Sequence, residues 1–295
     1  MIDYAYKKPK SLEEVFELLS EHGPNATLVA GGTDVLINIK HRRIAPKVLI
    51  SLRGLEALRY VRKNEGYHIG ALATHAMLAH SPLVQTELTA LAQGAGQVGS
   101  VQLRNVATIG GNVCNAAPSA DTAGPLLVFD ALAVLKGPEG VREVPLSEFF
   151  TGPSQAAIAA DEVLVELKIP PEIDQYGSAY CKHARRKAMN LPIVGVAVAI
   201  KIDKERVVSD ARIGLTVVAP TPVRAHAAED YLKGRVLDRQ TLEEAGRLAA
   251  SPECCLPRNS LRCQGWYRED MVRVLVPRVA QMAADQRYHR SEESQ

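Results

Sequence analysis

Leu28-Val29-Ala30-Gly31-Gly32-Thr33-Asp34 and Ala107-Thr108-Ile109-Gly110-Gly111-Asn112 are the two stretches that decide the fold. In both, a glycine pair with polar neighbours follows directly on an apolar run. Glycines at the end of a strand let backbone N–H groups approach a ligand closely, and a helix that begins just beyond them adds the positive end of its dipole. Both stretches therefore indicate a site for a diphosphate.

Neither glycine pair belongs to a common nucleotide-binding motif. A mononucleotide phosphate loop needs Lys-Ser or Lys-Thr after its last glycine, and a dinucleotide fingerprint needs a third glycine in the same strand-turn-helix unit. Both features are missing from this sequence. One glycine pair alone is more often an ordinary tight turn, but two pairs about 79 residues apart favour a ligand shared between two lobes.

The composition is typical of a globular protein. The 295 residues are enough for about two domains, and 46% hydrophobic and 23% charged residues argue against a disordered or fibrous chain. The net charge of +2 is too small to argue for a nucleic-acid partner. A solvated face or an anionic small ligand explains the basic clusters at 40–43 and 182–187.

The sequence also predicts the cellular compartment. Met1 to Tyr4 do not form a basic segment followed by an apolar one, and no apolar stretch approaches the ~18 residues of a membrane span. We therefore expect a cytoplasmic protein with no membrane span. Five cysteines, odd in number and unevenly spread, are interpreted as reduced thiols rather than a disulfide framework.

The first part of the chain, 1–175, is predicted to form one domain with two lobes, about 1–55 and 56–175. Ser11 to Glu14 form a capping box that opens an amphipathic helix, and strands are expected at 27–30 and 47–51. Thr33 or Asp34 can cap a helix through Lys40. The second lobe should contain a hairpin at 59–70, a helical stretch at 74–95 with a break at Ser81-Pro82, a helix at 121–129, and strands at 131–135, 141–144 and 162–169.

Pro170-Pro171 marks the expected boundary, because consecutive prolines resist both helix and central strand. A second domain at 176–285 should contain three antiparallel strands, at 177–182, 193–202 and 208–218, followed by helices at 224–232, 241–250 and 266–282. The last helix is expected to bury one face and to kink or end near Pro277. That face is Met271, Val274, Leu275, Val279 and Met282. A polar tail occupies 286–295.

Four motifs in order resemble the FAD-binding medium subunit of the xanthine oxidase family of molybdenum hydroxylases, which includes carbon monoxide dehydrogenase and 4-hydroxybenzoyl-CoA reductase. The resemblance covers nearly the whole chain. The motifs are Ala-Gly-Gly-Thr-Asp at 30–34, Ala-Thr-Ile-Gly-Gly-Asn at 107–112, Ala-Pro-Ser-Ala-Asp at 117–121 and Tyr-Cys-Lys-His-Ala-Arg-Arg at 180–186, and the match continues through Tyr267-Arg268 to Leu275.

The resemblance implies an α+β fold: a two-lobed vanillyl-alcohol-oxidase-type FAD-binding domain, then a C-terminal three-stranded antiparallel sheet with a helical bundle. It implies FAD as cofactor. The implied FAD-binding residues are Leu28, Val29, Ala30, Gly31, Gly32, Thr33 and Asp34 around the pyrophosphate, Thr108, Ile109, Gly110, Gly111 and Asn112 toward the pyrophosphate and flavin, Asp121 at a ribityl or ring-edge group, and Leu164 and Lys182 at the flavin. Lys182 would place a cation near the reduced ring.

The resemblance further implies an electron-transfer role. A large partner subunit with a molybdopterin cofactor would oxidise the substrate, and a small partner subunit with two [2Fe–2S] clusters would pass electrons to FAD. FAD would then reduce an external acceptor: NAD, a ferredoxin, a quinone or oxygen. A dimer of heterotrimers is the expected assembly, with no catalytic residue on this chain.

The cysteines and histidines give no metal site. Cys254, Cys255 and Cys263 lie close in sequence and could hold an iron–sulfur cluster with Cys114 or Cys181, but their spacing fits no ferredoxin-like run, which favours free thiols. The eight histidines have no metal-ligand spacing. His75 and His183 could approach the flavin, but core or surface roles are favoured for both.

Two other functions stay open. The chain could be a self-contained FAD-dependent oxidase or reductase, with Lys182, His183 or Arg185 as its base. It could also be a flavin-free scaffold for a complex, although two intact glycine pairs argue against that.

Overall fold

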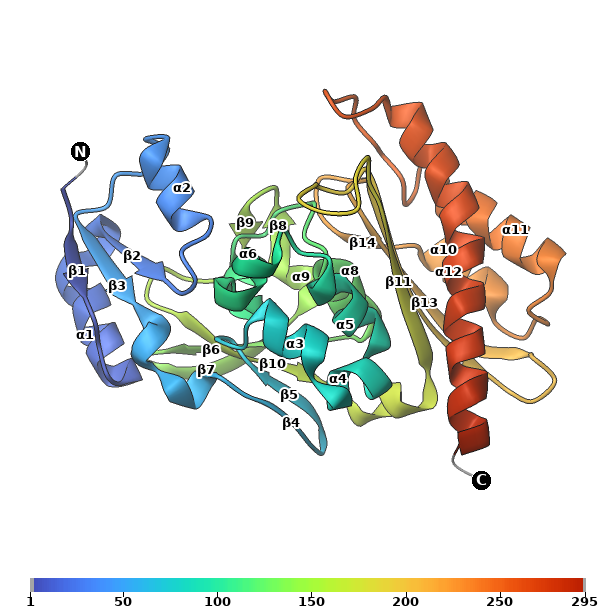
Figure 1. The fold of residues 1–295 in the computed structure, drawn as a ribbon, viewed down its shortest axis with the longest axis horizontal. Helices are drawn as coiled ribbons and strands as arrows, with labels where there is room; N and C mark the ends of the chain where they lie inside the picture. The colour runs from blue at the N-terminus through green and yellow to red at the C-terminus, as the bar shows by residue number, and fades with distance from the viewer. Residues whose placement is uncertain (1–2, 294–295) are drawn as a thin grey trace.

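The computed structural model describes residues 3–293, with side chains as far as Tyr288. Three bodies follow one another along the long axis of the molecule in Figure 1: an N-terminal lobe, a central lobe and a C-terminal domain. Among the described helices, none is long and apolar enough to cross a membrane.

The N-terminal lobe is a parallel sheet of three strands in the order β1 (Ala5–Lys7), β3 (Val48–Ser51), β2 (Ala26–Val29). Helix α1 (Leu12–His22) begins as predicted, because the Ser11 hydroxyl accepts a hydrogen bond from the Glu14 N–H. The Glu14 carboxylate accepts from the Lys10 N–H, one residue before the cap. Strand β1 was not predicted, and α2 (Val35–Lys40) has no side-chain cap from Asp34.

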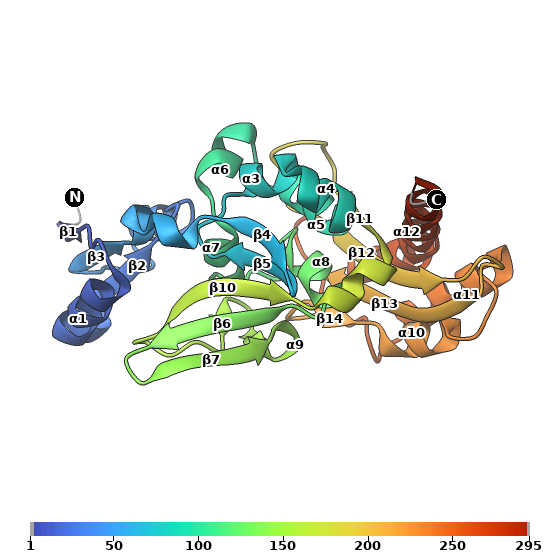
Figure 2. The same ribbon diagram turned by 90° about the horizontal axis from the view of Figure 1, so that it is seen from below.

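The central lobe is built on an antiparallel sheet of five strands. Its order is β4 (Val61–Asn64), β5 (Gly66–Gly70), β10 (Val163–Ile169), β6 (Leu132–Gly137) and β7 (Gly140–Pro145). Figure 2 shows helices α3 to α6 along one side of this sheet. The helical stretch predicted at 74–95 breaks at Ser81-Pro82 as expected and a second time at Leu88, so it forms α3 (His75–His80), α4 (Pro82–Glu87) and α5 (Thr89–Gly96). The remaining elements of this lobe are α6 (Val101–Val106), α7 (Ile109–Cys114), α8 (Ala123–Val128), α9 (Leu146–Phe149), β8 (Phe150–Gly152) and β9 (Gln155–Ala156).

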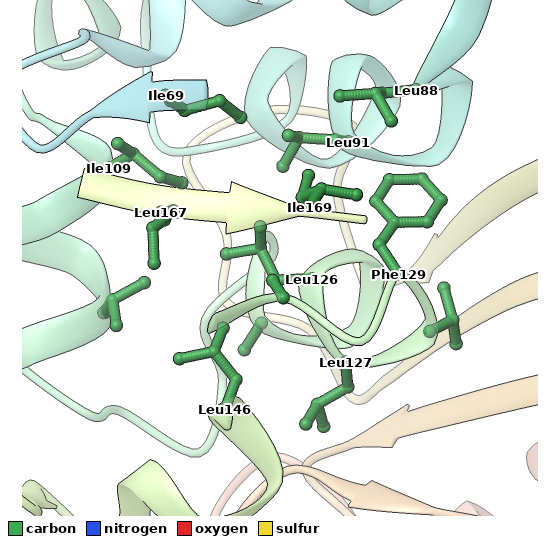
Figure 3. Close-up of a cluster of buried hydrophobic side chains, with 14 of the residues drawn as sticks. Ile69, Leu88, Leu91, Ile109, Leu126, Leu127, Phe129, Leu146, Leu167 and Ile169 are labelled. Atoms are coloured by element: carbon green, nitrogen blue, oxygen red, sulfur yellow. The ribbon is translucent and has the colours of Figure 1, made fainter. Parts of the chain in front are cut away.

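Helix α8 connects the central lobe to the C-terminal domain. On one side, Leu126 and Phe129 join the core with Leu167 and Ile169 of β10 (Figure 3). On the other side, α8 lies so close to the next sheet that a Cβ atom at Gly214 would be 2.8 Å from the Gly124 carbonyl oxygen. The two parts of the chain are therefore in direct backbone contact.

The C-terminal sheet is antiparallel and has four strands rather than the predicted three: β11 (Gly177–His183), β12 (Val194–Ile202), β13 (Val208–Thr216) and β14 (Val223–Arg224). The fourth strand is two residues long, too short for an alternating pattern to indicate it. In β12, Ala197 and Ala199 face the central lobe, while the valines between them pack with α10 (His226–Leu232), α11 (Arg239–Ala249) and α12 (Gly265–Glu293).

Two predictions about α12 need correction. The helix was expected to kink or end near Pro277 and to reach only 282, but it continues through Pro277 to Glu293. Its buried face is only partly the predicted one: Leu275 and Val279 are buried and Met271 packs against the same core, but Val274 and Met282 are 37% and 46% exposed. The face against the sheet is formed by Val272, Leu275, Val276, Val279, Ala280, Ala283 and Ala284. Small alanines let the helix approach the sheet closely, which hydrophobicity alone did not indicate.

Candidate functional site

A cavity of about 690 Å³ lies between the N-terminal and central lobes. Its wall comes from the loop after β2, the α5–α7 region, the segment before β10, and residues 189–191 of the C-terminal domain. Twelve of the fifteen sequence-predicted site residues line it: Leu28, Ala30, Gly31, Gly32, Thr33, Asp34, Thr108, Gly110, Gly111, Asn112, Asp121 and Leu164. Val29 and Ile109 are instead buried in neighbouring cores, and Lys182 lies behind Asp121.

The first glycine loop offers hydrogen-bond donors to the cavity. Within residues 3–293, no protein acceptor is present for the backbone N–H groups of Gly31, Gly32, Thr33 and Asp34. Gly32 has a φ of +78°, a conformation that turns successive N–H groups toward one side and favours glycine. Consecutive free N–H groups in such a turn form a concave anion site. A diphosphate is the anion that fits this loop.

The second glycine pair behaves differently from the prediction. Gly110 and Gly111 lie in the first turn of α7, which Thr108 caps. Their N–H groups are already used, since Gly110 donates to the Ala71 carbonyl and Gly111 to the Thr108 hydroxyl. The absence of a side chain at Gly110 allows α7 to pack closely against Ala71, because a Cβ atom at Gly110 would lie only 2.7 Å from the Ala71 Cβ atom.

The two glycine segments also touch each other. A Cβ atom at Gly31 would lie 2.8 Å from the Val106 carbonyl carbon and 2.9 Å from the Ala107 Cα atom, both on the segment that leads into α7. Real Cβ atoms are not found this close to backbone, so only glycine allows this contact. The two glycine segments, one from each lobe, are therefore in direct backbone contact at the wall of the cavity.

A buried ion pair forms the inner end of the cavity. Asp121 accepts hydrogen bonds from the Lys182 ammonium at 2.7 Å and from the Tyr180 hydroxyl at 2.8 Å, and both side chains of the ion pair are at most 7% exposed. Burial raises the pKa of the Asp121 carboxyl, and the Lys182 charge only partly opposes it. Burial beside Asp121 also raises the pKa of Tyr180. Asp121 was expected to start a helix as well, but α8 begins after Thr122 and has no side-chain cap.

Lys182 therefore does not line the cavity itself, and its charge acts on a ligand there through the paired Asp121 carboxylate. Its ammonium group also donates to the Gln97 carbonyl at 3.0 Å, which holds it between α5 and β11. A ligand in the cavity meets the carboxylate first and the cation second. The sequence indicated both residues but not their pairing, because 61 residues separate them.

His75, for which the sequence favoured a core or surface role over an approach to the flavin, lies in the cavity wall. It is completely buried at the start of α3, and neither ring nitrogen has a hydrogen-bond partner within the described residues. Burial, with a smaller contribution from Arg104, lowers its pKa to about 4. The imidazole is therefore neutral at pH 7, and an unpartnered buried nitrogen costs stability.

Replacing His75 with leucine is expected to reduce the fall in the free energy of unfolding that accompanies a drop in pH below 6.5. The folded-state pKa lies below the unfolded value of 6.5, so the unfolded chain binds a proton first and stability falls as the pH drops from 6.5 to about 4. The histidine contributes about 3 kcal/mol of this fall. Urea unfolding of both FAD-free proteins between pH 4 and 7 measures the difference, and parallel profiles would contradict the assignment.

Burial raises the pKa of the thiols of Cys114, Cys181, Cys254 and Cys255. Cys114 lines the cavity, but burial raises its pKa to about 12, so it is protonated at pH 7. Cys255 has its pKa raised to about 12 in the C-terminal core, where Cys254 is also buried. Within residues 3–293, no group of three or more His, Cys, Asp or Glu side chains is placed to hold a metal ion.

The fold has two lobes with a cavity between them, and the first glycine loop has N–H groups in the cavity wall that are free within the described residues. The family model described as "FAD binding domain in molybdopterin dehydrogenase" matches residues 2–172, and the model described as "CO dehydrogenase flavoprotein C-terminal domain" matches residues 179–283. The chain therefore belongs to the family of FAD-binding subunits of molybdopterin dehydrogenases. It is an oxidoreductase subunit, and FAD is its cofactor.

Similar proteins cover almost the whole chain. The putative xanthine dehydrogenase FAD-binding subunit of Escherichia coli K12 is 36% identical over 95% of this chain and 96% of its own. The carbon monoxide dehydrogenase medium chain of Hydrogenophaga pseudoflava is 34% identical over 95% and 96%. A solved structure of the Hydrogenophaga enzyme superposes with a TM-score of 0.91, covering 96% of this chain and 98% of that one at 34% identity. Quinoline 2-oxidoreductase from Pseudomonas putida 86 gives 0.89 at 28% identity, covering 96% and 97%.

Proposed function

We propose that this chain is the FAD-carrying electron-transfer subunit of a cytoplasmic molybdenum-dependent hydroxylase. FAD would take electrons from [2Fe–2S] clusters in a small partner subunit and give them to an external acceptor, while a large molybdopterin subunit oxidises the substrate. The assembly would be a dimer of heterotrimers. The observation that carries the proposal is the contact of two glycine segments around a cavity with four free N–H groups.

The residues present fit FAD. The N–H groups of Gly31 to Asp34 would donate to pyrophosphate oxygens, and the segment from Thr108 to Asn112 would contact the pyrophosphate and the flavin side. Asp121 would accept from a ribityl hydroxyl or a ring-edge group, with Lys182 holding its carboxylate in place. Leu164 would give an apolar contact to the flavin, in a domain of the vanillyl-alcohol-oxidase type. FAD supplies the conversion between single-electron and two-electron transfer.

The ionisable side chains of the cavity wall support a transfer role rather than substrate chemistry. Asp121 is paired with Lys182, Glu162 is paired with Arg142, and the His75 imidazole is buried. A general base needs a free group within hydrogen-bond reach of the proton that it removes. Asp121 and Glu162 are held in ion pairs, and the exposed Asp34 belongs to the loop proposed to hold the pyrophosphate, so we place the oxidation of the substrate in the partner subunit.

Absorption spectroscopy tests the proposal. The purified chain, after incubation with FAD and gel filtration, should keep a flavin spectrum and release FAD in acid. Coexpression with the molybdopterin and iron–sulfur subunits should give a complex that oxidises its substrate, whereas the chain alone should not. A chain that oxidised a substrate without partners would be a self-contained enzyme, and a chain that never bound FAD would be a scaffold.

A further inference from the structure

Two loops of the C-terminal domain carry five positive charges and one negative charge. The loop between β11 and β12, residues 184–193, contains Arg185, Arg186 and Lys187, and the loop between α11 and α12, residues 250–264, contains Arg258 and Arg262. We call these five residues the basic surface. The one acidic residue of the two loops is Glu253. The two loops together are therefore strongly positive, although the whole chain has a net charge of only +2.

The charges of the basic surface are not used within the described part of the chain. None of the five side chains lies within 4.0 Å of a carboxylate there. Arg185 donates to the backbone carbonyl of Arg262, which joins the two loops, and Arg186 donates to the Met189 carbonyl at 3.0 Å. Elsewhere most arginines close to acidic residues form ion pairs, as Arg224 does with Glu229 and Asp130.

The first loop of the basic surface continues into the cavity wall. Residues 189–191, which begin two positions after Lys187, line the cavity, and the Met189 N–H donates to the carbonyl of Gly99, which also lines it. In Figure 1 both loops lie at the upper edge of the C-terminal domain. One dinucleotide fills a cavity of about 690 Å³, so a second redox partner has to meet the flavin from the rim.

Large apolar side chains are exposed beside the charges. Leu256, Leu261 and Trp266 are each at least 62% exposed, and Met189 is 55% exposed. A small dinucleotide ligand makes no use of side chains spread over two loops, whereas a protein interface combines an apolar contact area with arginines and aromatic residues. The occupant that fits both features is a protein with an acidic face.

We propose that the basic surface docks an acidic, one-electron carrier protein, which exchanges electrons with FAD at the cavity rim. The proposal rests on the proposed function and names the class of its external acceptor. Reduced FAD would lose two electrons and two protons, two oxidised carriers would each take one electron, and the protons would go to solvent. Positive charge around the rim would orient the acidic carrier and speed its association.

The test uses the full chain loaded with FAD and a plant-type [2Fe–2S] ferredoxin, an acidic carrier, as the probe. Reduced ferredoxin is mixed with the protein in a stopped-flow instrument, and two ferredoxins reduce one FAD. The test variant is Arg186→Glu, Lys187→Glu and Arg258→Glu together. The control variant is Lys7→Glu, Lys8→Glu and Lys10→Glu, which makes the same charge change near β1, at the other end of the molecule.

The expected result is a loss of at least about tenfold in the second-order rate constant at low salt for the test variant, and less than about twofold for the control. The wild-type rate should fall as the ionic strength rises, since screening weakens the steering. FAD affinity and reduction by photoreduced deazaflavin, a small neutral reductant, should stay unchanged in both variants.

Three results would overturn the proposal. Equal slowing in both variants would mean that only the net charge matters, and an unchanged ferredoxin rate would mean that the carrier docks elsewhere. A test variant that kept its ferredoxin rate but lost reduction by NADH, or lost binding to the iron–sulfur subunit, would assign the surface to that partner instead. Failure of the proposed function looks different, because then the wild-type chain would not bind FAD or accept electrons from deazaflavin.

Discussion

Replacing Gly31 with alanine is expected to weaken FAD binding on the order of a hundredfold. The new methyl group would meet the backbone of Val106 and Ala107, which cannot turn aside as a flexible side chain can, so the loop has to move. Hydrogen bonds to a charged group contribute about 1.5–3 kcal/mol each, and displacement of two N–H donors from the pyrophosphate is enough for this loss. Fluorescence titration of the FAD-free chain measures the dissociation constant.

Gly96→Ala is the matched control for that experiment. Gly96 ends α5, and a Cβ atom there would make only ordinary contact with Ala79 at 3.8 Å. Alanine in a helix is favoured over glycine by up to about 1 kcal/mol, so this variant should keep its FAD affinity and its melting temperature. A Gly31→Ala protein that bound FAD like the Gly96→Ala protein would show that contact between the glycine segments does not shape the site.

Replacing Asp121 with alanine is expected to destabilise the FAD-free chain by about 3–5 kcal/mol. Lys182 would keep a buried positive charge with only the Gln97 carbonyl as partner, and removal of one member of a buried pair is costly for this reason. The double variant Asp121→Ala, Lys182→Met should regain much of the loss, since neither charge remains. Urea unfolding of the single and double variants gives the coupling energy.

Asp130→Ala is the control for the buried pair. Asp130 bridges Arg212 and Arg224 between the same two parts of the chain, but its side chain is 48% exposed. Exposed pairs contribute about 0–1 kcal/mol. If Asp121→Ala cost no more than Asp130→Ala, burial of the Asp121–Lys182 pair would not be what stabilises the contact between the central lobe and the C-terminal domain.

The sequence predicted the elements whose signals are local. The serine cap of α1, the long valine-rich β12 and the order of the helices after β13 follow from capping and periodicity, and the structure confirms them. The first glycine loop was also predicted to face a ligand with its N–H groups. The division into domains at 175 and 176 and the roles of the individual site residues stay predictions.

What the sequence could not give depends on distant contacts. The second glycine pair was expected in a turn, but Thr108 caps a helix that begins there, so its N–H groups are used within the protein. The buried face of α12 differs in part from the predicted one because alanines, not the larger Met282, fit against the sheet. The residues around His75 in the sequence do not indicate that its ring is buried. The burial comes from the packing of α3 against the segment before α7.

The arrangement of the cavity wall has a consequence for the synthesis of the chain. The wall begins with the loop that starts at Leu28 and is completed only by residues 189–191. At ribosomal rates of about 5–20 residues per second, the roughly 155 residues between Asp34 and Met189 take on the order of ten seconds to appear. The complete wall of the cavity is therefore available to FAD only after both lobes and the first strand of the C-terminal domain have been synthesised.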